Sequence, residues 1–173
     1  MIWEVDALYL EPQYSQLESL LKMPPNAHAT IKGGPGYPNI NGMVFFYQAA
    51  DGVLLLAQVR GLPQGTEPCS SNVFGFHIHE GSSCTGNAED PFANAGSHYN
   101  PHNCPHPAHA GDLPPLFGNH GFAFMAFVTD RFSVNEVIGR TVIIHLSPDD
   151  FTTQPSGNSG KKIACGQIMS NIS

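Results

Sequence analysis

Apolar and polar residues alternate along most of the chain with a period of two, which is typical of β-strands. Three such runs follow one another from residue 26 onward, at residues 28–34, 41–52 and 53–63. Ala50-Asp51-Gly52 joins the second run to the third, and its Asp-Gly step favours a tight hairpin turn. The pattern therefore predicts a meander of three antiparallel strands.

Further runs of the same kind predict later strands, at residues 74–81, 120–130, 138–147 and 161–169. Two segments without a periodic apolar pattern interrupt them, at residues 82–111 and 148–160. A loop as long as the first is unusual inside a compact domain unless covalent or metal bonds organise it. We therefore expect a strand scaffold that carries two functional loops.

Residues 1–25 follow a different pattern. Leu17, Leu20 and Leu21 have the spacing of one helix face, and Pro24-Pro25 would end the helix. We interpret this extension as a short helix that packs over an edge or end of the sheet. An oligomer contact or a tethering arm is the alternative. Residues 26–173 are then one domain.

Composition agrees with a globular all-β protein. The 173 residues are 41% hydrophobic and 12% charged, and 18 Gly and 15 Pro predict many chain reversals. The formal charge of −7 argues against nucleic acid or an anionic membrane as a partner, because Lys and Arg bind both. No apolar run approaches the roughly 18 residues of a membrane span.

The compartment is left open by the sequence. The N-terminus lacks the basic and long apolar regions of a secretory signal, so we expect a soluble chain, cytoplasmic or already processed. The four cysteines form no CxxC pair, which favours one or two disulfides over a zinc finger. Disulfides suit an oxidising compartment and therefore hint at an exported form.

Histidines are the candidate functional residues, because six of the nine lie within the segment from His77 to His109. His77 and His79 are two residues apart in a predicted strand, so both side chains project to the same face. The loop GSHYNPHNCPHPAHAGDLP adds four histidines and Asp112. Tetrahedral zinc with His and Asp ligands would order such a loop. The His77/His79 pair, with an imidazole from residues 138–147, offers nitrogen donors that suit copper.

These motifs resemble the copper/zinc superoxide dismutases. GFHIHEG, GSHYNP, HAGDLP, IGRTVIIH followed by Asp149-Asp150, and GNSGKKIACG occur in the order that this family has. The resemblance implies an eight-stranded antiparallel Greek-key β-barrel or flattened sandwich. It also implies copper and zinc cofactors, superoxide as the substrate, dismutation to dioxygen and hydrogen peroxide, and a monomer or homodimer.

The resemblance assigns roles to individual residues. It implies copper ligands His77, His79, His98 and His145, and zinc ligands His98, His106, His109 and Asp112. His98 would bridge the two metals and carry a proton during turnover. His102 competes with His106 for the zinc site. Asp149 matches the carboxylate that links a copper histidine to a zinc histidine, here His77 and His106.

The cysteines also have counterparts in the family. Cys84 and Cys165 match its disulfide. Cys69 and Cys104 lie outside the common pattern, and either a second bridge or two free thiols is consistent with their positions.

One position departs from the family. Lys162 stands where the family usually has an arginine that helps to dock superoxide, and lysine keeps the charge but lacks the planar fork of donors. We expect reduced turnover, with Lys161 as a second candidate for this task. The alternatives are a superoxide dismutase-like metal-binding protein with low or no turnover, or an interaction module that works through residues 1–25.

Overall fold

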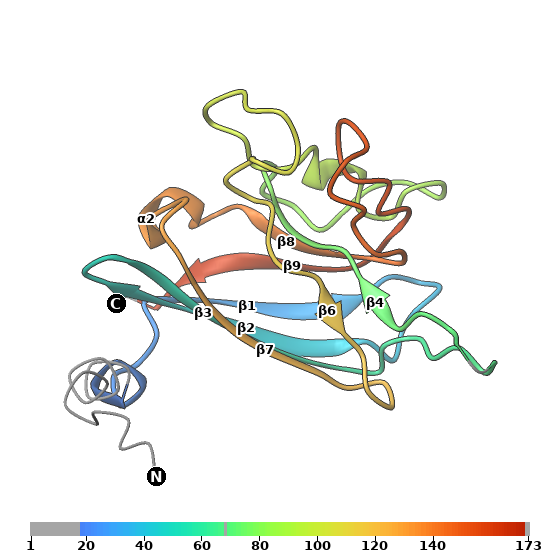
Figure 1. Ribbon diagram of the computed structural model, residues 1–173, viewed down its shortest axis with the longest axis horizontal. Coiled ribbons are helices and arrows are strands. Elements are labelled where there is room, and N and C mark those ends of the chain that lie inside the picture. Colours follow the sequence, from blue (N-terminus) through green and yellow to red (C-terminus); the bar gives the residue numbers. More distant parts are fainter. Residues whose placement is uncertain (1–17, 68, 172–173) are drawn as a thin grey trace, which may run out of the picture.

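The computed structural model describes residues 18–67 and 69–171, which form an almost entirely β-stranded body (Figure 1). The elements in chain order are β1 (Ala27–Gly33), β2 (Asn41–Ala49), β3 (Gly52–Arg60), β4 (Val73–Phe74), β5 (Phe76–His79), the 3-10 turn η2 (Ala93–Ala95), β6 (Leu116–Phe117), β7 (Ala123–Thr129), α2 (Val134–Val137), β8 (Thr141–His145) and β9 (Lys162–Ser170).

Seven strands form one antiparallel sheet in the order β5-β8-β9-β1-β2-β3-β7, and β4 pairs with β6. The predicted three-strand meander is present, and Ala49 pairs with Gly52 at its hairpin. Only Gly75 separates β4 from β5, and β6 packs against β7, so the two ends of the sheet meet. When β4 and β5 are counted as one interrupted strand, the barrel has the expected eight strands.

The interior is built from alternate positions of the strands. In β1, Ala27, Ala29 and Ile31 are fully buried while the residues between them are partly or wholly exposed. In β5 all four residues are buried. Phe76 and Ile78 belong to the hydrophobic core, so His77 and His79 project to the opposite face. Something other than the core must cover that face.

The two long loops provide the cover. Figure 1 shows the segment after β5 and the segment between β8 and β9 on the same side of the strands. The first loop also pairs with the free edge of β5, because Tyr99 N–H donates to Ile78 O at 2.8 Å and Ile78 N–H donates to Gly111 O at 2.9 Å. These bonds bring two distant parts of the loop to one strand.

A disulfide joins Cys84 in the first loop to Cys165 in β9, across a sequence separation of 81 residues. The second bridge that the sequence allowed is not formed, because Cys69 and Cys104 are both free. Cys104 instead lies in a turn held by Asn100, whose side-chain amide bonds to both the N–H and the C=O of Cys104, at 3.0 and 2.9 Å.

The N-terminal extension is described only in part. Residues 18–21 are helical, while Leu17 and the residues before it lie outside the described part of the chain. Leu21 and Met23 expose 44% and 62% of their surfaces. Among the described residues, no helix has the length and apolar character needed to cross a membrane.

Candidate metal centre

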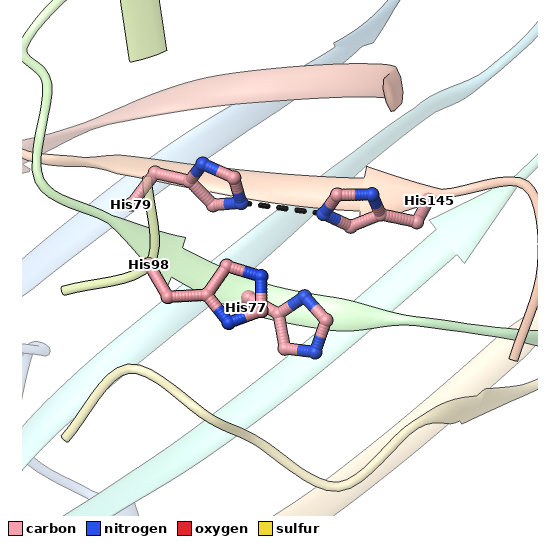
Figure 2. A group of neighbouring side chains, drawn as sticks. All are labelled: His77, His79, His98 and His145. Atoms are coloured by element: carbon pink, nitrogen blue, oxygen red, sulfur yellow. Dashed lines mark hydrogen bonds between the residues drawn. The ribbon is translucent and has the colours of Figure 1, made fainter. Parts of the chain in front are cut away.

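Four histidines converge over β5 and β8, and we call them the strand group: His77, His79, His98 and His145. One nitrogen from each ring lies within 4.8 Å of the others. Figure 2 shows His79 and His145 facing each other through their Nε2 atoms, 3.2 Å apart, with the rings of His77 and His98 beside them.

Strand pairing sets most of this geometry. His77 pairs with Ile143 across β5 and β8, so His145 is its diagonal neighbour on the same face of the sheet. His77 and His79 are themselves two residues apart on β5. His98 comes from the loop, and an isolated bridge places its backbone opposite His79. The sheet therefore places three of the four side chains on one face.

The second nitrogen of each strand histidine is held from outside the group. His79 Nδ1 donates to Gly96 O at 2.8 Å, and His145 Nδ1 donates to Gly160 O at 3.1 Å. His77 Nε2 donates to Asp149 Oδ2 at 2.8 Å. A bond of this kind fixes the tautomer of a ring and turns its free nitrogen toward the centre.

The second set, which we call the loop group, contains His98, His106, His109 and Asp112, again with one ligand atom of each within 4.8 Å of the others. Asp112 lies at its centre. Its Oδ1 accepts from His98 Nδ1 at 2.7 Å, and its Oδ2 lies 3.0 Å from His106 Nδ1. His102, the sequence alternative to His106, is exposed and lies outside both groups.

The two groups share His98, whose Nδ1 faces Asp112 while its Nε2 faces the strand group. Asp149 connects them a second time, because its Oδ1 accepts from His106 Nε2 at 2.9 Å while its Oδ2 accepts from His77. Gly157 makes room for this carboxylate: its φ is +65°, and a Cβ there would overlap Asp149. The structure thus brings together every ligand that the resemblance implied.

Arg131 braces the loop group from outside. Its Nη1 lies 3.1 Å from Pro107 O, 3.2 Å from His109 O and 3.2 Å from Asp112 O, so one guanidinium nitrogen bonds to three carbonyls of the loop. No sequence motif marks Arg131, because a single arginine after a strand has no local pattern that reveals its role.

Protonation states favour metal binding. Burial holds the pKa of His79 well below its ordinary value and lowers that of His145 to about 3. Burial raises the pKa of Asp149, but hydrogen bonds from His77, the Phe151 N–H and His106 outweigh it and bring the pKa down to about 2. Neutral imidazoles and ionised carboxylates at neutral pH are the forms that bind metals.

Unpartnered nitrogens test whether metals fit. Within the described chain, four buried ring nitrogens form no hydrogen bond: His77 Nδ1, His98 Nε2, His106 Nδ1 and His109 Nδ1. His106 Nδ1 lies near Asp112 but without hydrogen-bond geometry. Buried polar atoms are rarely left unsatisfied, so these nitrogens fit two cations. Four nitrogens suit copper, and three nitrogens with one carboxylate suit tetrahedral zinc.

Comparison with known proteins identifies the family of this chain. A sequence model of the family described as Copper/zinc superoxide dismutase matches residues 40–168. The chain belongs to the copper/zinc superoxide dismutase family. It is 32% identical over 157 residues to "Superoxide dismutase [Cu-Zn] 2" of Aquifex aeolicus. The aligned region covers 82% of this chain and 85% of that protein.

Two further relatives of the family agree. "Superoxide dismutase [Cu-Zn]" of Deinococcus radiodurans is 32% identical over 145 residues, or 73% of this chain and 76% of that protein. The solved structure of the Cu/Zn superoxide dismutase from Brucella abortus matches with a TM-score of 0.67 and 25% identity, over 82% of this chain and 98% of that one. Fold and sequence therefore indicate the same family.

A pocket of about 930 Å³ leads to the strand group, and His79, His98 and His145 line it. Lys161 and Lys162, the two candidates for anion docking, line the same pocket. Lys162 does not stand free there, because its Nζ lies 2.6 Å from Asp90 Oδ2. Sequence reasoning missed Asp90, which lies in the segment between the disulfide and η2 and carries no motif.

Proposed function

We propose that this chain is a superoxide dismutase that converts two superoxide anions and two protons into one dioxygen and one hydrogen peroxide. The observation that carries the proposal is His98, a single imidazole shared between a group of four histidines and a group with a carboxylate. Copper and zinc are the cofactors that such donor sets suit.

The ligand assignment is part of the proposal. His77, His79, His98 and His145 would hold copper, and His98, His106, His109 and Asp112 would hold zinc. When bound, copper supplies one-electron oxidation and reduction, and zinc, which has no redox chemistry, supplies a fixed charge. Asp149 orients His77 and His106, so the two sites are aligned by one carboxylate.

The chain's own contribution to turnover is proton handling and anion guidance. His98 Nε2 faces the strand group and has no hydrogen-bond partner among the described residues, so it can take up a proton and pass it to a reduced oxygen species. The opposite nitrogen, Nδ1, lies 2.7 Å from Asp112 Oδ1, so a zinc ion held by both residues would keep the ring aimed while the proton on Nε2 changes. Lys161 and Lys162 supply positive charge at the pocket.

The alternative role, metal binding with low turnover, has one specific observation in its favour: Lys162 is paired with Asp90, which weakens its attraction for an anion. The pocket that leads to His79 and His145 favours the enzyme. We propose in addition that the mature chain works in an oxidising compartment, because the Cys84–Cys165 disulfide ties the first loop to β9 and persists only where thiols are not kept reduced.

The decisive experiment is superoxide dismutation by the purified protein after loading with copper and zinc, with metal content measured on the same sample. We expect fast dismutation with one copper and one zinc per chain, and loss of activity after copper is removed by a chelator. Full loading of both metals with no dismutation would support the metal-binding role instead.

A further inference from the structure

An ion pair forms part of the wall of the pocket that leads to the strand group. Lys162 Nζ lies 2.6 Å from Asp90 Oδ2, and the same ammonium donates to Phe92 O at 3.3 Å. The Lys162 side chain is only 15% exposed, whereas that of Asp90 is 39% exposed. The ammonium is therefore held by the protein and is not simply presented to a diffusing anion.

Strand pairing places Lys162 next to the strand group. It pairs with His145 across β8 and β9, just past a register shift between Ile144 and His145, and both residues line the pocket. A cation in this position acts directly on the strand group.

Asp90 is a fixed partner and not a passing one. Its Oδ1 accepts from the N–H of Phe92 at 3.0 Å, and Asn87 Oδ1 accepts from the N–H groups of Glu89 and Asp90 at 2.9 Å each. The loop holds the carboxylate in place, and the ammonium of Lys162 meets it there. The position of the ammonium is set by Asp90.

The charges that line the pocket determine how the Lys162–Asp90 ion pair affects an approaching anion. Three carboxylates line it (Glu80, Glu89 and Asp90), against two ammonium groups (Lys161 and Lys162). Lys161 is exposed and forms no salt bridge within residues 18–67 and 69–171, whereas Lys162 is paired. An approaching anion therefore meets a weaker positive field than two free lysines would produce.

We propose that Asp90 is a positioning residue that holds Lys162 against the wall of the pocket and thereby limits the rate of superoxide capture. Lys161 is then the free cation at the mouth. This inference rests on the proposed function, because it concerns how the anionic substrate of that reaction reaches the strand group.

The first test compares Asp90→Asn with Glu89→Gln. Both changes remove one negative charge from the lining of the same pocket, but Glu89 forms no salt bridge with Lys162 in the described part of the chain, and only the change at residue 90 removes the charge that pairs with that ammonium. We expect Asp90→Asn to raise kcat/KM about threefold at low ionic strength and to steepen its salt dependence. Glu89→Gln should give less than half of that gain.

A double-variant cycle separates positioning from simple charge removal. In a Lys162→Met background there is no ammonium to release, so the gain from Asp90→Asn should fall to the gain that Glu89→Gln gives. An equal gain in both backgrounds would show that Asp90 acts only through its own charge. A loss or no change of kcat/KM in Asp90→Asn alone would overturn the inference.

A measurement without turnover completes the test. Burial raises the pKa of Asp90, but the bonds from Lys162 and the Phe92 N–H outweigh it and hold the pKa below its ordinary value. Carboxyl carbon NMR of the reduced, metal-loaded protein should show this low pKa, and Lys162→Met should raise it. An unchanged titration would overturn the pairing itself. A wild-type protein without dismutation would instead overturn the proposed function and, with it, the kinetic part of the inference.

Discussion

Three of the four histidines in the strand group lie on β5 and β8, whereas every member of the loop group lies in residues 98–112. The strand histidines hold their positions through sheet pairing and bonds to backbone carbonyls. The loop group depends on Asp112 within it and on Asp149 and Arg131 outside it. The strand group is therefore built into the barrel, while the loop group must be assembled from a segment without regular strands.

The largest expected effect comes from removing one ligand of each group. Asp112→Ala should lower zinc affinity by more than about 100-fold, beyond the range usual for outer contacts, and copper affinity by much less. His145→Ala should lower copper affinity by more than about 100-fold and zinc affinity by much less, because every member of the loop group lies in residues 98–112 and none lies on β8. Competition titrations with chromophoric chelators measure both affinities. If either variant loses both metals equally, the two groups are not built independently.

Asp149→Asn tests the link between the groups. An amide has only one acceptor oxygen, so it cannot accept from both His77 and His106 as the carboxylate does. We expect zinc affinity to fall about 30-fold and copper affinity only a few-fold, within the range for outer contacts, because His77 is also fixed by its strand. Asp150→Asn is the matched control, since Asp150 bonds to Thr152 and Thr153. A larger loss of copper than of zinc would contradict the comparison.

The difference between the strand group and the loop group also explains how much of the site the sequence could predict. The His77/His79 pair and the strand that carries His145 follow from a period of two, which fixes the face of each side chain. The choice between His102 and His106 does not follow from local pattern, because both lie in an irregular loop. It needed the family resemblance, and the structure then left His102 exposed.

Pairings between distant residues were out of reach for a physical reason. Lys162 and Asp90 are 72 residues apart, and Arg131 meets carbonyls that belong to another loop. Neither contact can be predicted from the neighbouring residues in the sequence. Backbone carbonyls have no sequence signature, and a single charged residue can pair with many different partners. The Cys84–Cys165 bridge could be predicted only because the motifs on either side of it resemble a known family.

Arg131→Met should produce a smaller effect than the loss of Asp149. Without the guanidinium, the carbonyls of Pro107, His109 and Asp112 lose a shared donor, so the loop group becomes more mobile. We expect about a tenfold loss of zinc affinity, the low end for outer contacts, with copper affinity unchanged. Hydrogen exchange should speed up within residues 105–112. Arg60→Met, which changes an arginine over Phe122, is the control. Unchanged zinc affinity with faster exchange would limit Arg131 to loop order.

The last prediction concerns what the buried strand group costs the metal-free protein at acid pH. Burial lowers the pKa of His145 from 6.5 to about 3, so between these values the unfolded chain takes up a proton that the folded chain does not. The free energy of unfolding should therefore fall as pH drops from 6.5 toward 3.

His145→Asn removes that contribution. Its free energy of unfolding should fall less steeply with acid, by at most about 1.4 kcal/mol per pH unit. Urea unfolding with a chelator present, at several pH values in this window, measures the slope. Identical slopes for the variant and the wild type would mean that His145 takes up its proton in the folded metal-free protein too. The strand face would then be open to water before the metals bind, and the contrast with the loop group would apply only to the loaded enzyme.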